Sequence, residues 1–258
     1  MRGESEPVMD YNKILSRKVQ EMKPSGIRRF FDIANEMEGV ISLGVGEPDF
    51  KTPFSVRQEA IRTLEKGRTW YSANAGLMEL REEICSYSKR RFGLTYEPKD
   101  EVVVTVGGSE AIDLCFRALL NPGEEVLVPE PSFVCYSPLV DLVGAVPVPI
   151  ETKAENHFRV TKQDLLDKIT DKTKLLVLPY PNNPTGGIMR REHLEDICGA
   201  LRGTDIMGLS DEIYAELTYN SKHASIASLD GMWDRTIVVN GFSKAYAMTG
   251  WRLGWASG

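Results

Sequence analysis

The sequence lacks the features that mark nucleic-acid-binding, membrane-spanning and secreted proteins. Its 31 Lys and Arg never form a run of five or more, and 37 Asp and Glu give a net charge of −6 at pH 7, which argues against a nucleic-acid partner. No apolar run approaches the roughly 18 residues of a membrane-spanning helix. Residues 1–10 have no apolar core of the kind that a signal peptide needs. We therefore expect a cytoplasmic protein without a membrane or nucleic-acid partner.

Metal-site and hydrolase signatures are missing as well. The 3 histidines do not have metal-ligand spacing, so no metal is expected. Neither the triphosphate-binding pattern G-x-x-x-x-G-K-[ST] nor the nucleophile pattern G-x-S-x-G occurs, which argues against nucleoside triphosphates and serine hydrolases. The cysteines form no C-x-x-C pair, so we expect reduced, mostly buried thiols. They are Cys85, Cys115, Cys135 and Cys198.

What is present is an ordinary globular composition. The 258 residues are 42% hydrophobic and 26% charged, enough for one large domain or one and a half. From residue 101 onward strand patterns alternate with helical segments. This alternation predicts an α/β fold, a three-layer αβα arrangement with a mostly parallel sheet. The predicted strands lie at residues 101–106, 125–128, 145–150, 174–178, 206–210, 236–239 and 252–256.

The residues before 101 predict helices joined by loops. A helix with one apolar face is predicted over residues 25–37, and a short strand that leads into a Gly-Pro-rich turn over residues 41–50. Thr52 can cap the next helix, with Pro53 in its first turn, and Gly67 ends that helix. The apolar face of the first of these helices must pack on another element.

Lys244 is the residue around which the chemistry is organised. It follows the predicted strand 236–239, and the carboxyl ends of parallel strands form the edge where open α/β sheets bind ligands. Its neighbours are small, hydroxylic or aromatic, with no acid within six residues on either side. Such a lysine loses its proton more easily than a free one and can form a Schiff base with a carbonyl. The alternative is a solvated lysine in a loop.

A turn with two glycines offers a phosphate site. Gly107 and Gly108, followed by Ser109 and Glu110, join a strand to a helix predicted to begin near Ala111. Backbone N–H groups and the positive end of a helix favour an anion there.

Polar and aromatic residues follow other predicted strands. Asp211 comes directly after strand 206–210, with Tyr214 shortly behind, and Asn183 follows strand 174–178. A helix cap is the alternative for Asp211, but it does not explain why an acid, a tyrosine, an asparagine and a lysine collect at one edge. Phe133, after strand 125–128, is either a core residue or an aromatic ring facing a ligand.

One long pattern carries a family resemblance. The segment S-K-x-Y-x-M-T-G-W-R-L-G-W resembles the lysine segment of the pyridoxal-phosphate-dependent aminotransferases of the aspartate aminotransferase family (class I/II, fold type I). Four further patterns of that family occur upstream in the same order: G-V-G-E-P-D-F, Y-S-A-N-A-G-L-M-E-L-R, P-N-N-P-T-G and S-D-E-I-Y. The resemblance implies that residues 51–258 are the cofactor-binding large domain. Residues 1–50 are then an N-terminal arm and part of a small domain whose remainder lies beyond residue 258.

The resemblance also implies a reaction and its residues. An amino group passes from an L-amino acid to a 2-oxo acid through a pyridoxal 5'-phosphate Schiff base on Lys244, assisted by Asp211 at the pyridine nitrogen and Tyr214 at the phenolic oxygen. Asn183 binds that oxygen and the substrate, and the backbone at Gly46 lies beside the substrate carboxylate. The remaining cofactor contacts that it implies are Gly108, Ser109, Glu110, Phe133, Ser243 and Arg252, with Tyr71 reaching across a homodimer interface.

Two alternatives stay open. Carbon–sulfur β-lyases and cyclopropane-forming synthases share this fold and its lysine chemistry. The chain could also be an inactive fragment, because the family's sequence continues beyond this point and includes an arginine that grips the substrate carboxylate. We expect the 258 residues alone to fold poorly or to bind cofactor without turnover. The motif spellings favour, weakly, aromatic, alanine or N-acetyl-diaminopimelate aminotransferases.

Overall fold

The computed structural model describes residues 9–22, 33, 36–37, 39, 41 and 46–258. The chain divides into two compact units, Met1–Gly44 and Val45–Gly258. The first unit contains a 3-10 turn, η1 (Tyr11–Lys13), and a short helix, α1 (Arg17–Glu21). Most of the predicted helix over residues 25–37 lies outside the described residues. Most of the short strand predicted at the start of residues 41–50 lies outside the described residues, and residues 46–50, where a turn was predicted, form neither helix nor strand.

The second unit is built on a seven-stranded sheet with the order β1-β7-β6-β5-β4-β2-β3. The neighbouring pairs β3–β2, β2–β4, β4–β5 and β5–β6 are parallel. Strand β7 is antiparallel to both of its neighbours, β6 and β1. Each predicted strand from residue 101 onward is present within a few residues, so the α/β prediction is confirmed. The strands are β1 (Val102–Thr105), β2 (Glu125–Glu130), β3 (Val146–Glu151), β4 (Thr173–Leu178), β5 (Met207–Asp211), β6 (Thr236–Gly241) and β7 (Gly254–Ser257).

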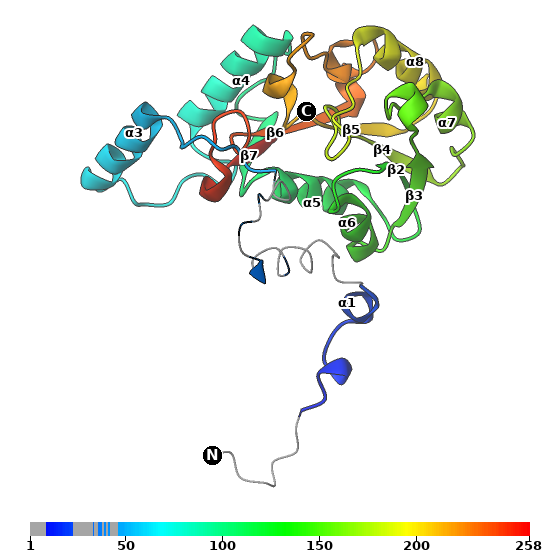
Figure 1. Cartoon of the computed structure of the whole chain (residues 1–258), viewed down its shortest axis with the longest axis horizontal. Helices are drawn as coiled ribbons and strands as arrows, with labels where there is room; N and C mark the ends of the chain where they lie inside the picture. The colour runs from blue at the N-terminus through cyan, green and yellow to red at the C-terminus, as the bar shows by residue number, and fades with distance from the viewer. Residues whose placement is uncertain (1–8, 23–32, 34–35, 38, 40, 42–45) are drawn as a thin grey trace. The chain divides into compact units, whose positions relative to one another are not determined.

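Helices cover both faces of the sheet, as Figure 1 shows. On one face, α5 (Gly108–Leu119) and α6 (Tyr136–Leu142) pack on β2, β4, β5 and β6 through an apolar cluster that includes Phe116 and Leu175. On the other face lie α4 (Met78–Phe92), α7 (Lys162–Leu166) and α8 (Arg191–Leu201). The 3-10 turns are η2 (Ala154–Asn156), η3 (Ala215–Leu217), η4 (Ile226–Ser228), η5 (Trp233–Arg235) and η6 (Thr249–Trp251).

The sequence explains the central and edge strands differently. In β4 the run from Leu175 to Leu178 is buried throughout, as expected for a parallel strand covered on both faces. Each such leucine contributes about 1.5–3 kcal/mol through burial. The edge strand β3 carries Pro147 and Pro149. Proline is tolerated at an edge, because one side of the strand has no hydrogen-bonding partner, and it discourages pairing with another sheet.

The helix ends follow local rules. The predicted helix after Pro53 is α3 (Phe54–Glu65), which has no buried residue and lies at the outer edge of the unit (Figure 1). Thr161 and Asp164 form a capping box at the start of α7. Helix α5 begins at Gly108 rather than near Ala111, so the prediction placed its start too late.

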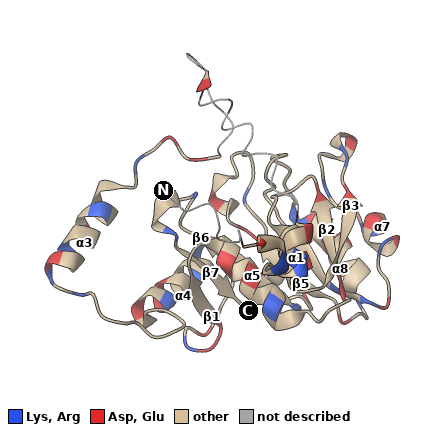
Figure 2. Ribbon diagram, turned by 90° about the horizontal axis from the view of Figure 1, so that it is seen from below, with Lys and Arg blue, Asp and Glu red and all other residues tan. Residues whose placement is uncertain are grey.

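The described residues carry charges of both signs on the outer helices, including α3 and α4 (Figure 2). Within the same part of the chain, no helix is both long enough and apolar enough to cross a membrane. No group of three or more His, Cys, Asp or Glu side chains gathers there as metal ligands would.

Candidate active site

The candidate site lies at the carboxyl edge of the sheet. Asp211 is the last residue of β5, and Lys244 lies in the loop that follows β6. Because β4, β5 and β6 are parallel neighbours, their carboxyl ends meet at this edge. The order of the strands therefore brings together residues that are far apart in the sequence.

The Lys244 amine is half-buried and donates a hydrogen bond to the Gly46 carbonyl, with Nζ and O 2.6 Å apart. It also lies 5.6 Å from the centre of the Tyr214 ring. Burial lowers the pKa of Lys244, the nearby Glu47 carboxylate raises it and the Arg252 guanidinium lowers it further, with a net decrease. This direction is the one that the sequence neighbours predicted. The acid near Lys244 comes from a distant part of the chain, so local sequence could not reveal it.

The loop after Lys244 is fastened to the segment that carries Gly46. The Thr52 hydroxyl donates to the Ala247 carbonyl at 2.6 Å and accepts from the Trp251 indole N–H at 3.1 Å. The Thr249 hydroxyl donates to the Glu47 carboxylate. These contacts hold the Gly46 carbonyl within reach of the lysine.

A phosphate-sized anion could be held where α5 begins beside Arg252. Gly107 has φ +81°, and a Cβ there would lie 2.5 Å from the Arg252 Nη2 atom. A Cβ on Gly254 would lie 2.6 Å from the backbone of Gly107 and Gly108, so β7 can approach the start of α5 only with glycine at this position. The close approach aims a guanidinium and the positive end of a helix at the same space.

Two predicted phosphate contacts have further features. Ser243 is buried directly before Lys244. The Glu110 carboxylate accepts a hydrogen bond from the Val106 backbone N–H, which ties the first turn of α5 to the end of β1. The predicted cofactor contact of Glu110, like that of Ser109, stays a prediction.

Asp211 is buried and held by two donors. Its Oδ2 atom accepts from the Tyr136 hydroxyl at 2.8 Å, and its Oδ1 atom accepts from the Ile213 backbone N–H at 3.2 Å. Burial raises the pKa of Asp211, while these two hydrogen bonds lower it. No helix begins at Asp211, so the helix-cap alternative is wrong. The Asp211 carboxylate is instead oriented by Tyr136 and Ile213. Its burial in the ionised form lowers the stability of the folded protein.

Tyr136 is the site residue that sequence reasoning missed. It stands at the start of α6, and burial raises its pKa well above the ordinary value. The one sequence feature that could have pointed to Tyr136 is its position three residues after Phe133 in the segment E-P-S-F-V-C-Y. Nothing in the sequence, however, indicates that α6 faces the end of β5.

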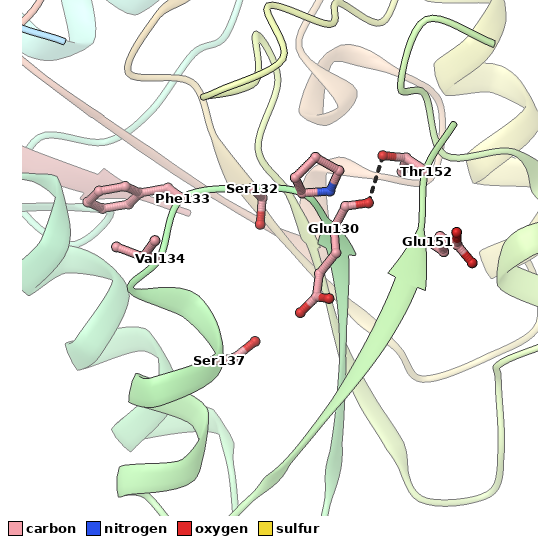
Figure 3. Close-up of a pocket in the computed structure, with 8 residues that line it drawn as sticks. Glu130, Ser132, Phe133, Val134, Ser137, Glu151 and Thr152 are labelled. Atoms are coloured by element: carbon pink, nitrogen blue, oxygen red, sulfur yellow. Dashed lines mark hydrogen bonds between the residues drawn. The ribbon is translucent and has the colours of Figure 1, made fainter. Parts of the chain in front are cut away.

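The other predicted residues surround these groups. Burial raises the pKa of Tyr214, as does the Asp211 charge, whereas a side-chain hydrogen bond with Asn183 lowers it. Phe133 packs edge-on against Tyr136 with ring centres 6.0 Å apart. It is 37% exposed, so it is not a core residue, and it lines an open pocket of about 530 Å³ together with Glu130 (Figure 3). Tyr71 lies apart, with its side chain fully exposed.

The fold and the site together define an α/β protein with a lysine and a buried acid at one sheet edge. Beside them lies an anion cradle, the space between the Arg252 guanidinium and the start of α5 at Gly107 and Gly108. The sequence matches the family described as "Aminotransferase class I and II" over residues 38–258. The YugH protein of Bacillus subtilis is 54% identical over 94% of this chain and 63% of its own length. Aromatic-amino-acid aminotransferase 2 of Thermococcus litoralis is 46% identical over 93% of this chain and 62% of its own length.

Solved structures agree with the sequence match. A double mutant of Thermus thermophilus aspartate aminotransferase superposes with a TM-score of 0.90 at 42% identity, over 95% of this chain and 64% of that one. The chain therefore belongs to the class I and II aminotransferase family. It spans about 63% of the length of the curated relatives that it matches.

Proposed function

We propose that the natural protein transfers an amino group from an L-amino acid to a 2-oxo acid, with pyridoxal 5'-phosphate bound at Lys244. The observation that carries the proposal is the meeting of Lys244 and Asp211 at one sheet edge, beside the anion cradle at Arg252. Family membership supports amino-group transfer in general. The individual cofactor contacts and the reaction are those that the family resemblance implies for these residues.

The described residues fit this cofactor. Arg252 and the start of α5 suit a phosphate dianion, and the missing Cβ of Gly107 leaves space beside the guanidinium. The buried Asp211 carboxylate suits a protonated ring nitrogen, because a cationic partner would offset the burial that raises its pKa. The half-buried Lys244 has a lowered pKa, as an amine needs in order to act as a nucleophile.

When bound, pyridoxal 5'-phosphate supplies an aldehyde that condenses with a primary amine and a ring that accepts electrons from a broken bond at the substrate α-carbon. Asp211 would keep the ring nitrogen protonated, with its orientation fixed by Tyr136. Tyr214 and Asn183 would donate to the phenolic oxygen. The neutral amine of Lys244 would take the proton from the substrate α-carbon.

The remaining contacts complete the proposed site. The hydroxyls of Ser109 and Ser243, the backbone N–H groups at Gly108 and Glu110, and the Arg252 guanidinium would bind the phosphate. Phe133, whose ring is partly exposed, would cover one face of the cofactor ring. The backbone near Gly46 would lie beside the substrate carboxylate.

We also propose a homodimer in which Tyr71 serves the partner's phosphate site. The support is its full exposure, together with the exposed apolar residues Phe54, Leu64 and Trp70 on and after α3. Large apolar side chains left exposed in one segment of the chain are typical of an interaction surface. In the same proposal, residues 1–50 form an N-terminal arm and part of a small domain, and residues 51–258 form the large domain.

The experiment replaces Lys244 by Ala in the full-length natural protein, with the exposed Lys222→Ala as the matched control. Wild type and control should take up pyridoxal 5'-phosphate, show the absorbance of the lysine-bound cofactor, and retain it covalently after borohydride reduction. The Lys244→Ala protein should show none of these signals and almost no turnover. Covalent retention in that variant would refute the assignment.

Product analysis separates the proposed reaction from its alternatives. Incubation with an L-amino acid and 2-oxoglutarate should yield a new 2-oxo acid and glutamate in equal amounts. Release of ammonia and pyruvate from a sulfur-containing amino acid, without glutamate, would instead identify a carbon–sulfur β-lyase.

A further inference from the structure

A second buried acid stands next to Asp211 and points to the opposite face of the sheet. Successive residues of a strand alternate between faces, so Asp211 meets Tyr136 on the α6 side while Glu212 turns away from it. The Glu212 side chain is completely buried. The proposed reaction gives this residue no direct role, because it faces away from the Asp211–Tyr136 side of the sheet.

The carboxylate of Glu212 has a full set of donors. Its Oε1 atom accepts from the hydroxyls of Ser210 at 2.9 Å and Ser225 at 2.6 Å. Its Oε2 atom lies 2.8 Å from the Nε2 atom of His223. This distance is that of a hydrogen bond between the carboxyl group and the imidazole ring. Four buried polar groups from β5 and the loop before η4 thus form one closed network.

The network fixes the backbone on which Asp211 stands. The Glu212 backbone N–H donates to the Val239 carbonyl of β6 at 2.8 Å, which extends the β5–β6 pairing one residue past Asp211. His223 is itself held edge-on by Phe92 of α4, with ring centres 5.5 Å apart. A change in the backbone at Asp211 would therefore have to move Glu212, which is tied to β6 through Val239 and to the loop before η4 through His223 and Ser225.

We propose that Glu212 is a positioning residue that holds the Asp211 carboxylate toward the ring nitrogen of the cofactor. The inference rests on the proposed function, since it assumes that Asp211 meets that nitrogen. At metal sites, groups that orient a ligating side chain typically change affinity about 10–100-fold when they are replaced, and we expect the lower end of that range for an organic cofactor. A residue that served only to stabilise the fold would affect every ligand of the site equally.

The test uses a pair of ligands that differ only at the atom that Asp211 meets. Dissociation constants are measured for pyridoxal 5'-phosphate and for its analogue in which a C–H group replaces the ring nitrogen. In the full-length Glu212→Gln protein, affinity for the natural cofactor should fall about tenfold, and affinity for the analogue should change little. The preference of the site for a ring nitrogen should therefore fall by nearly the same factor.

The matched control is Glu216→Gln. Glu216 lies in η3, and its carboxylate is bound by Arg91 and by the Tyr87 hydroxyl, neither of which hydrogen-bonds Asp211. This variant should keep the wild-type preference between the two ligands, whatever its melting temperature. If Glu212→Gln does not fold, Ser225→Ala removes a single donor from the network and should lower the preference in the same direction.

Each outcome has one reading. An equal loss of affinity for both ligands in the Glu212→Gln and Ser225→Ala proteins would overturn the positioning role and leave the proposed function intact. Failure of the wild-type protein to bind pyridoxal 5'-phosphate through Lys244 would overturn the proposed function, and this inference with it.

Discussion

Replacement of Asp211 by Asn should make the cofactor-free protein more stable at neutral pH while abolishing tight cofactor binding. Burial raises the pKa of Asp211 above its ordinary value of 3.8. Below that value the carboxyl is protonated in both the folded and unfolded states, so it carries no penalty. As the pH rises through the folded-state pKa, the folded protein must hold a buried charge that the unfolded protein exposes to water. Because the unfolded chain already ionises above 3.8, stability in the wild type is lost between 3.8 and the higher folded-state pKa and is constant above it.

The hydrogen bonds of the site should survive the substitution. The Asn oxygen can accept from the Ile213 N–H, now 3.2 Å from Oδ1, and the Asn amide can donate to the Tyr136 oxygen, now 2.8 Å from Oδ2. The hydroxyl needs only to rotate, because it both donates and accepts. What changes is the buried charge, and each unit of raised pKa corresponds to about 1.4 kcal/mol. A gain of about 1 kcal/mol raises the melting temperature of a domain of this size by about 2–4 °C.

The assay is scanning calorimetry of the cofactor-free proteins between pH 5 and 8, followed by titration with pyridoxal 5'-phosphate. The difference in melting temperature between Asp211→Asn and wild type should grow with pH and then level off. Asp230→Asn, at an exposed position, should show no such trend. A cofactor-free Asp211→Asn protein that is less stable than wild type at pH 8, or that binds the cofactor as tightly, would refute the reasoning.

Three other predictions follow from the same geometry. Tyr136→Phe removes a donor to a charged group, so it should raise the pKa of Asp211 further and destabilise the protein by about 1.5–3 kcal/mol at pH 8, measured by urea unfolding; unchanged stability would contradict this. Gly254→Ala places a Cβ 2.6 Å from the backbone of Gly108 and should prevent β7 from packing, leaving little soluble protein on gel filtration. Tyr71→Phe should weaken pyridoxal 5'-phosphate but not phosphate-free pyridoxal, with the melting temperature of the cofactor-free protein unchanged, because this side chain is fully exposed in the chain.

The fold was largely predictable because its strands are short apolar runs bounded by turn residues. The run before Asp211 and the run before Asn240 are each buried on both faces, and such runs have no other stable place in a protein of this size. The reversed direction of β7 could not be predicted. It depends on Gly254, which lets that strand reach the start of α5, and a glycine alone does not specify direction.

The residues that hydrogen-bond the acids at and next to the site, Tyr136 and His223, were less predictable than the site residues themselves. Asp211 and Lys244 could be found because Asp211 directly follows a strand pattern and Lys244 lies in the loop after another. Tyr136 and His223 act across the fold, and their partners are set by how α6 and the loop before η4 pack on the sheet. Local patterns carry no information about such pairs, because hydrogen bonds between distant side chains leave no periodicity in the sequence.

Lys244 illustrates how local and distant effects combine. Its sequence neighbours predict a lysine without an acidic partner, yet the chain brings Glu47 close enough to raise its pKa. The Thr249 hydroxyl donates a hydrogen bond to the Glu47 carboxylate. The Lys244 amine donates instead to the neutral carbonyl of Gly46. Burial then outweighs the attraction of the acid, and the pKa of Lys244 falls overall. The pKa of Lys244 is thus lowered chiefly by burial, while a hydroxyl rather than the lysine hydrogen-bonds the Glu47 carboxylate.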